Sequence, residues 1–222
     1  MQASDPPLGG ALRPAINPIL GGRMRALSHA TTLSASAADP TASLPKLTLV
    51  LGGARSGKSA YAEKLITAAL PPGGRAVYLA TAEALDSEMV ARIAAHRARR
   101  GAAWITREAP IDLAGALVAE SAPTRPVLVD CLTLWLANLL QAGRDPVQET
   151  TALARSLARA AGPIVVVSNE VGFGIVPDNA LARDFRDHSG RLHQTIASSA
   201  DRVVLIAAGL PLLLKNTVNL TP

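Results

Sequence analysis

Aromatic residues, cysteines and long apolar runs are scarce in this sequence of 222 residues, and each scarcity excludes a class of protein. Phe, Trp and Tyr make up 3% of the chain, so it lacks the aromatics interleaved with basic residues that grip single-stranded nucleic acid. Cys131 is the only cysteine, which excludes an intrachain disulfide and gives no reason to expect an oxidising compartment. No uninterrupted apolar run has the ~20 residues of a membrane-spanning helix. We therefore expect a cytoplasmic protein with no membrane span and no nucleic-acid partner.

The net charge of +5 is shared between two parts of the chain. The first 46 residues carry four basic and two acidic side chains, which accounts for +2 and leaves +3 for the remainder. An excess of this size is modest, and it fits an enzyme that binds phosphates in a cleft.

Residues 1–46 differ in composition from the rest of the chain. They contain six of the 16 prolines, many Ser, Thr and Ala residues, and no sustained helical or strand period, so they cannot bury much surface. We predict a disordered N-terminal extension over 1–46. Residues 47–222 are then a single α/β domain, for which their number is sufficient.

Beyond residue 46, short apolar runs alternate with helical patterns. The predicted strands cover 47–51, 76–80, 104–106, 126–130, 164–168 and 202–207, and the predicted helices cover 57–69, 86–100, 111–120, 132–140, 152–161 and 180–200. Strands that alternate with helices in this way predict a doubly wound, mostly parallel sheet with helices on both faces.

A phosphate-binding loop follows the first predicted strand and opens the first predicted helix. It satisfies the pattern G-x-x-x-x-G-K-[ST] with Gly52, Gly53, Ala54, Arg55, Ser56, Gly57, Lys58 and Ser59. In such a loop backbone N–H groups surround phosphate oxygens, the helix N-terminus adds positive charge, and Lys58 reaches the β and γ phosphates of ATP or GTP. The loop and its context predict the P-loop NTPase-like (RecA-like) α/β fold class.

Two residues are candidates for holding Mg²⁺. Ser59 offers its hydroxyl from the loop. A carboxylate at the end of a neighbouring strand commonly completes such a site, and Asp130 directly follows the run Pro126–Val129. The alternative for Asp130 is that it caps the helix beginning at Leu132.

His96 has two interpretations. On the helix predicted from Asp86, it shares a face with Met89 and Ile93, among Arg92, Arg97, Arg99 and Arg100. A histidine near a helix C-terminus is favoured by the helix dipole, and the local pattern favours this structural role. A neutral imidazole beside arginines can instead attack a phosphorus atom.

Six ordered blocks of sequence between about Leu47 and Lys215 resemble a known enzyme family, the bifunctional adenosylcobinamide kinase and adenosylcobinamide-phosphate guanylyltransferase of cobalamin biosynthesis. The blocks are the phosphate loop, Tyr78–Thr81, Ala91–Arg97 with Trp104–Glu108, Val129–Thr133, Ser168–Pro177, and Leu181–Asp187 with Gly190 and Arg191.

The resemblance implies a two-step reaction and roles for particular residues. The family phosphorylates the hydroxyl of adenosylcobinamide with ATP or GTP. It then transfers GMP from GTP through a guanylylated histidine, whose motif position His96 occupies, beside Arg97. The resemblance also implies that Ala80, Thr81 and Glu108 lie near the nucleotide and that the protein is a homo-oligomer, specifically a trimer.

Several points stay open at this stage. Glu170 follows a predicted strand and could engage metal or substrate, or cap a local turn. His193 stands where either Asn or His is acceptable, and we assign it no chemistry. The chain could also carry out only one of the two steps, or be a GTP-binding regulatory switch without covalent chemistry.

Overall fold

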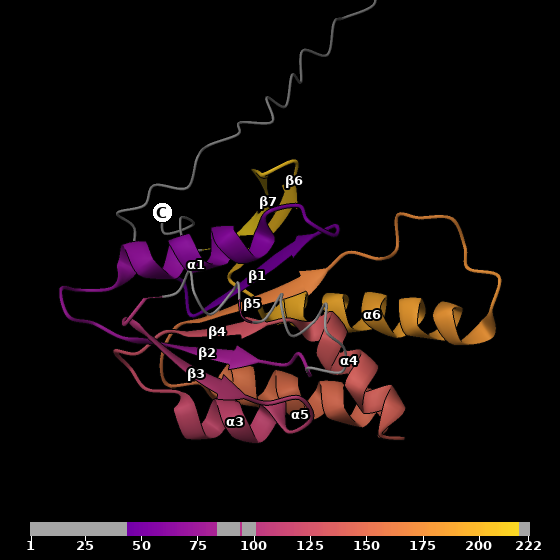
Figure 1. Cartoon of the computed structure of the whole chain (residues 1–222), viewed down its shortest axis with the longest axis horizontal. Coiled ribbons are helices and arrows are strands. Elements are labelled where there is room, and N and C mark those ends of the chain that lie inside the picture. Colours follow the sequence, from indigo (N-terminus) through magenta and orange to yellow (C-terminus); the bar gives the residue numbers. More distant parts are fainter. Residues whose placement is uncertain (1–43, 84–93, 95–100, 218–222) are drawn as a thin grey trace, which may run out of the picture. The chain divides into compact units, whose positions relative to one another are not determined.

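The structure is a computed structural model that describes residues 44–83, 94 and 101–217. These residues form a seven-stranded sheet in the order β3-β2-β4-β5-β1-β6-β7 (Figure 1). Every neighbouring pair is parallel except β6 and β7, which are antiparallel. The strands are β1 (Leu47–Gly52), β2 (Ala76–Ala80), β3 (Trp104–Glu108), β4 (Val127–Asp130), β5 (Ile164–Asn169), β6 (Arg202–Ala207) and β7 (Leu210–Asn216).

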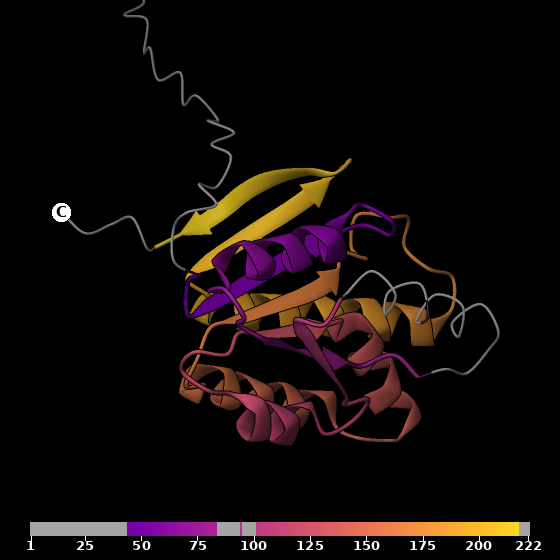
Figure 2. The same ribbon diagram turned by 60° about the vertical axis from the view of Figure 1, so that its left-hand side comes forward.

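Helices cover both faces of this sheet. The described helices are α1 (Lys58–Ala69), α3 (Leu113–Glu120), α4 (Leu132–Gln141), α5 (Pro146–Arg159) and α6 (Ala180–Ser199). Helix α1 lies on one face and the other four helices lie on the opposite face, where α5 packs between α3 and α6 (Figures 1 and 2). The predicted α/β fold class is confirmed as a mostly parallel sheet with helices on both faces. In the described part of the chain, no helix is both long and apolar enough to cross a membrane.

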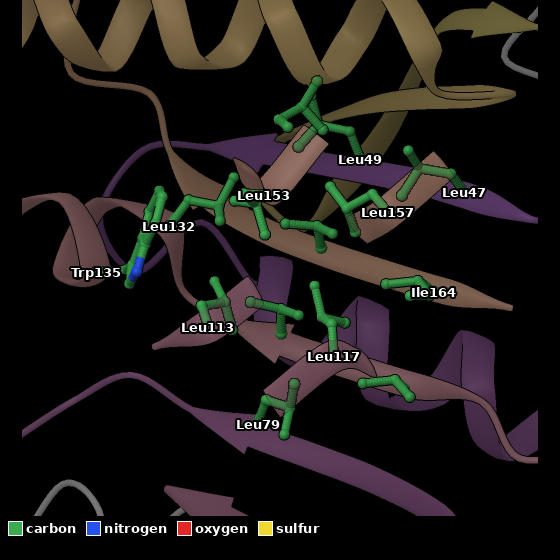
Figure 3. Close-up of a cluster of buried hydrophobic side chains, with 14 of the residues drawn as sticks. Leu47, Leu49, Leu79, Leu113, Leu117, Leu132, Trp135, Leu153, Leu157 and Ile164 are labelled. Atoms are coloured by element: carbon green, nitrogen blue, oxygen red, sulfur yellow. The ribbon is translucent and has the colours of Figure 1, made fainter. Parts of the chain in front are cut away.

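The larger core lies between the sheet and the four helices of one face. Leu47 and Leu49 point into it from β1 because alternate strand residues face the same side (Figure 3). Trp135 of α4 is 1% exposed, and its indole N–H donates to the carbonyl of Ile111 at 2.8 Å. A second core joins Ala62 and Ile66 of α1 to the other face of the sheet. Burial of apolar surface on both faces holds the strand ends in fixed register.

Two elements differ from the sequence predictions by more than two residues. Helix α5 begins at Pro146 and not at residue 152, because Asp145 caps it by accepting from the N–H groups of Val147 and Gln148. The antiparallel strand β7 was not predicted at all.

A tight turn connects β6 to β7. Ala208 and Gly209 both have positive φ, of 51° and 79°, which is the requirement of a type I′ hairpin turn. Pro211 is tolerated in β7 because this strand is at the edge of the sheet. The hairpin forms one border of the sheet in Figure 2.

Two predicted segments fall on residues outside the described ranges. Of the helix predicted over 86–100, the structure describes only Ala94, which is helical. Of the predicted extension, it describes Leu44 to Lys46, where Leu44 packs against the second core and the Lys46 ammonium donates to the carbonyl of Ala158 at 2.9 Å. The disorder of residues 1–43 therefore stays a prediction, whereas Leu44 and Lys46 contact the folded domain.

Candidate nucleotide-binding site

The predicted site residues that the structure describes meet at one edge of the sheet. Gly52 pairs with Asn169 of β5 on one side and with Ile206 of β6 on the other. Ala80 at the end of β2 is in register with Glu108 of β3 and with Asp130 of β4. In a parallel sheet these carboxyl ends form the edge where ligands bind.

The phosphate loop turns tightly between β1 and α1. Gly57 has a φ of 97° and precedes Lys58, the first residue of α1. Inside the loop, the Ser56 N–H donates to the Gly53 carbonyl at 3.2 Å, and the Lys58 ammonium donates to the same oxygen at 2.9 Å. Lys58 is 7% exposed, whereas Arg55 is exposed with a φ of 54°. The lysine is therefore folded into the loop, and the arginine side chain is at the surface.

Two segments that are distant in sequence brace the loop. The Gly209 N–H, in the unpredicted turn after β6, donates to the Ser56 carbonyl at 3.0 Å, and the Glu170 N–H donates to the Gly52 carbonyl at 2.9 Å. Gly52 has no room for a side chain, because a Cβ there would lie 2.5 Å from Ser56 Oγ and 2.6 Å from the Ile206 carbonyl oxygen. The loop conformation thus depends on β5, on β6 and on the turn that follows β6.

Asp130 ends β4, and β5 separates that strand from β1. The expectation that Asp130 ends a strand directly beside the phosphate loop is therefore wrong by one strand. Asp130 Oδ2 accepts a hydrogen bond from the Tyr78 hydroxyl at 2.9 Å. The capping alternative finds no support, because the N-cap of α4 is Cys131 and no side chain caps that helix.

Carboxylate and hydroxyl oxygens, such as those of Asp130 and Ser59, suit Mg²⁺, which takes few protein ligands when nucleotide phosphates and water supply the others. Among the described residues there is no cluster of three or more His, Cys, Asp or Glu side chains able to hold a metal ion by themselves. By donor type, Ser59 and Asp130 suit Mg²⁺ as two of its ligands, and among the described residues they are not part of a metal site built by the protein alone.

Thr81 is fully buried, and its hydroxyl is already engaged. It donates to the Cys131 carbonyl and accepts from the Cys131 N–H, both at 2.8 Å, while the Asn138 amide donates to the Thr81 carbonyl at 2.8 Å. Thr81 thus ties the ends of β2 and β4 together. That Thr81 lies near the nucleotide stays a prediction. The hydroxyl of Thr81 holds the backbone at this edge of the sheet.

The pKa of the Cys131 thiol is shifted by its surroundings at the end of β4. Burial raises the pKa of its thiol, and the adjacent Asp130 carboxylate raises it further. A hydrogen bond with Thr133 and the positive charge of Lys58 oppose that shift in pKa.

The remaining predicted site residues are less fully described. His96 and Arg97 lie outside the described residues, so their predicted roles stay predictions. Glu108 is exposed at the end of β3. The guanidinium of Arg183, which belongs to the last of the six blocks that resemble the family, donates to the carbonyls of Pro177 and Asp178 at 3.0 and 2.8 Å, and it thereby fixes the segment before α6.

One buried contact at this edge involves His193, a residue with no role predicted from the sequence. His193 Nε2 lies 2.7 Å from Ser168 Oγ, and His193 Nδ1 lies 3.5 Å from Glu170 Oε2. Nothing in the local sequence around His193 indicates that α6 would bring it to the end of β5.

Comparison with known proteins gives a family and close relatives. A family model described as cobinamide kinase / cobinamide phosphate guanyltransferase matches residues 48–214. The bifunctional adenosylcobalamin biosynthesis protein CobP of Pseudomonas aeruginosa is 51% identical over 170 residues, which cover 75% of this chain and 96% of that protein. The CobU proteins of Salmonella typhimurium and Escherichia coli, described in the same words, are 41% and 38% identical over 182 residues, 75% of this chain and 98% of each of them.

Among solved structures, the flagellar accessory protein FlaH from Methanocaldococcus jannaschii aligns with a TM-score of 0.46 and 12% identity over 78% of this chain and 80% of FlaH. The ATPase domain of G40P aligns with a TM-score of 0.42 and 14% identity over 72% of this chain and 69% of that domain.

Proposed function

Because the chain belongs to the cobinamide kinase / cobinamide phosphate guanyltransferase family, we propose that it catalyses two consecutive transfers to a cobinamide. It first phosphorylates the hydroxyl of adenosylcobinamide with ATP or GTP. It then transfers GMP from GTP to that phosphate and forms adenosylcobinamide-GDP. The observation that carries the proposal is the phosphate loop, which lies with buried Lys58 at the carboxyl edge of a parallel sheet. The chain that contains this loop is 51% identical to the bifunctional CobP protein over 170 residues.

In the kinase step, backbone N–H groups of Gly53 to Ser59 bind the phosphates, and Lys58 neutralises the charge that develops on the transferred phosphoryl group. Ser59 and Asp130 would hold Mg²⁺, which would offset the negative charge of the phosphates and so lower the repulsion met by the incoming hydroxyl. Both side chains come from elements whose ends the sheet fixes, so the site is preorganised before the nucleotide binds.

In the guanylyl step, His96 attacks the α-phosphate of GTP, a P–N bond forms, and pyrophosphate leaves. Arg97 offsets charge on the phosphate oxygens. The phosphate of the cobinamide then attacks the guanylylated histidine, which releases the imidazole and completes the product. Glu108 accepts hydrogen bonds from the guanine edge, for which its exposed position at the same edge of the sheet is suitable.

We further propose that the protein works in the cytoplasm as a homo-oligomer, a trimer by the family resemblance. The exposed leucines of β7, Leu210, Leu212, Leu213 and Leu214, offer an apolar border that a second copy could cover. Light scattering of the purified protein measures the number of subunits directly.

Two separate assays test the proposed function. The first follows γ-labelled ATP or GTP into adenosylcobinamide phosphate, and the second follows α-labelled GTP into adenosylcobinamide-GDP. Lys58→Ala is expected to abolish both transfers, whereas Lys64→Ala, an exposed lysine of the same helix, retains both. A wild-type protein that binds GTP and gives neither labelled product would contradict the proposal and favour a GTP-dependent switch.

A further inference from the structure

His193 is buried at the nucleotide edge although the proposed reaction does not use it. It lies on α6 and is 6% exposed. Its Nε2 is 2.7 Å from the hydroxyl of fully buried Ser168, and its Nδ1 is 3.5 Å from Glu170 Oε2. The histidine thus connects a serine near the end of β5 with the carboxylate that follows this strand.

The neighbours of the ring indicate how it is protonated. A carboxylate accepts hydrogen bonds and does not donate them, so Nδ1 carries the proton that faces Glu170, and Nε2 accepts from the Ser168 hydroxyl. Burial lowers the pKa of His193, and the negative charge of Glu170 only partly opposes this shift. The imidazole is therefore neutral at neutral pH, with its N–H dipole directed at Glu170.

The structure also holds Glu170 by two backbone contacts. Its own N–H donates to the carbonyl of Gly52, the first residue of the phosphate loop, at 2.9 Å. Its Oε1 accepts from the Gly172 N–H at 2.6 Å. With His193 beside Oε2, the carboxylate has a group near each oxygen, yet 18% of the side chain remains exposed. It is therefore fixed and still open to a substrate.

Three acids stand at the carboxyl ends of the described parallel strands, and Glu170 is the nearest to the phosphate loop in the sheet. It follows β5, which pairs with β1 over the full length of β1. Asp130 is on β4, one strand further away, and accepts from Tyr78. Glu108 is on β3, at the border of the sheet opposite to β7. Glu170 also has a backbone hydrogen bond to the loop itself, from its N–H to the Gly52 carbonyl.

We propose that Glu170 is the catalytic base of the kinase step and that His193 is the residue that positions its carboxylate. This inference rests on the proposed function. The acceptor hydroxyl oxygen forms a bond to the γ-phosphorus, the bond from that phosphorus to the bridging β-γ oxygen breaks, and the nucleoside diphosphate leaves. The hydroxyl proton passes to the Glu170 carboxylate. In the guanylyl step the attacking imidazole and phosphate groups need no such base, so Glu170 serves only one of the two transfers.

The first test compares both transfers in Glu170→Gln, which keeps the size of the side chain and removes its basicity. The kcat for phosphorylation of adenosylcobinamide is expected to fall about 100-fold or more, the usual contribution of general base catalysis. The KM for ATP and the protein-bound label from α-labelled GTP stay near the wild-type values. Glu149→Gln, on the surface helix α5, is the matched control and leaves both transfers unchanged.

The second test separates positioning from packing with two amides at position 193. Asn can place its amide N–H where Nδ1 faces Glu170, whereas Gln extends its amide to where Nε2 meets Ser168. If His193 positions Glu170, His193→Asn retains most of the kinase kcat and His193→Gln loses it. Equal losses would mean that packing of the ring is what matters, and the reverse order would mean that the contact with Ser168 is what matters; either result would overturn the positioning role.

A third variant keeps the test informative if a change at His193 unfolds the protein. A Cβ on Gly172 would lie 2.8 Å from Glu170 Oε1, so Gly172→Ala displaces the carboxylate without touching the histidine. It should lower the kinase kcat and spare the guanylyl label. If wild type phosphorylates adenosylcobinamide and the kcat of Glu170→Gln is within about threefold of the wild-type kcat, the role of Glu170 as base is refuted while the proposed function stands. If wild type lacks kinase activity, the proposed function itself fails.

Discussion

Replacement of Gly52 by alanine tests whether the phosphate loop depends on close backbone packing. The added Cβ would lie 2.5 Å from Ser56 Oγ and 2.6 Å from the carbonyl oxygen of Ile206. Ser56 could rotate its hydroxyl away, but the Ile206 carbonyl belongs to β6, which is paired along β1 and cannot move alone. Overpacking of this kind costs about 1–3 kcal/mol. In a chain of 222 residues, each kcal/mol lowers Tm by about 2–4 °C.

We therefore expect the Tm of Gly52→Ala without nucleotide to fall by roughly 2–12 °C, and its affinity for GTP to fall as the loop shifts. Gly53→Ala is the matched control for stability, because a Cβ at Gly53 would have no atom within 4 Å. Differential scanning calorimetry at one protein concentration measures both variants, since Tm depends on concentration in an oligomer. An unchanged Tm for Gly52→Ala, or an equal loss in Gly53→Ala, would refute the reasoning.

Four further predictions concern other parts of the chain. Deletion of residues 1–43 should leave both transfers and Tm unchanged, and loss of folding would contradict it. Arg55→Ala should change GTP affinity only a few-fold in a titration, because Arg55 is exposed; a collapse of binding would place it on the phosphates. Asp130→Asn should abolish Mg²⁺-dependent turnover in both transfer assays. Full activity of this variant would mean that Asp130 is not a ligand of the metal. The pKa of His193 is lowered in the folded protein, so the fold favours the neutral imidazole. This contribution to stability is present above about pH 6.5 and is lost as the pH falls through the folded-state value. In urea unfolding, His193→Asn should therefore lose less stability on acidification than wild type.

The sequence predicted the elements whose signals are local. Strand β2 has the predicted bounds, and β1, β5 and α6 differ from theirs by one residue. Each is a continuous apolar run or an amphipathic segment with clear ends. The Asp145-Pro146 pair was also a local signal, an N-cap followed by proline at the first helical position, and an earlier start for α5 could have been predicted from it.

Strand β7 gave a weaker signal. Its three consecutive leucines, Leu212 to Leu214, show no alternation, because an edge strand need not present one polar and one apolar face. The turn before it consists of Ala208 and Gly209, without the Asn-Gly or Asp-Gly pair that usually marks a type I′ hairpin. Because this strand and its turn were not predicted, the hydrogen bond from the Gly209 N–H to the Ser56 carbonyl in the phosphate loop could not be predicted either.

The residues of the candidate site were predicted in part. The phosphate loop is a contiguous motif, so its residues could be named from the sequence. The contacts that brace it, from Glu170 to Gly52 and from Gly209 to Ser56, join segments distant in the chain, and only the strand order brings them together. The same holds for His193, whose partner Ser168 is on another element. The order of the strands also explains why Asp130 lies one strand further from the loop than expected.

The central claim is that this chain performs both a phosphoryl transfer and a covalent guanylyl transfer. The most direct test incubates wild type and His96→Asn with α-labelled GTP, measures acid-labile label bound to the protein, and assays phosphorylation of adenosylcobinamide in parallel. The account predicts bound label on wild type, none on His96→Asn, and retained phosphorylation by the variant, because a P–N bond needs the imidazole and the kinase step does not. Wild-type protein without bound label, or His96→Asn labelled as strongly as wild type, would contradict it.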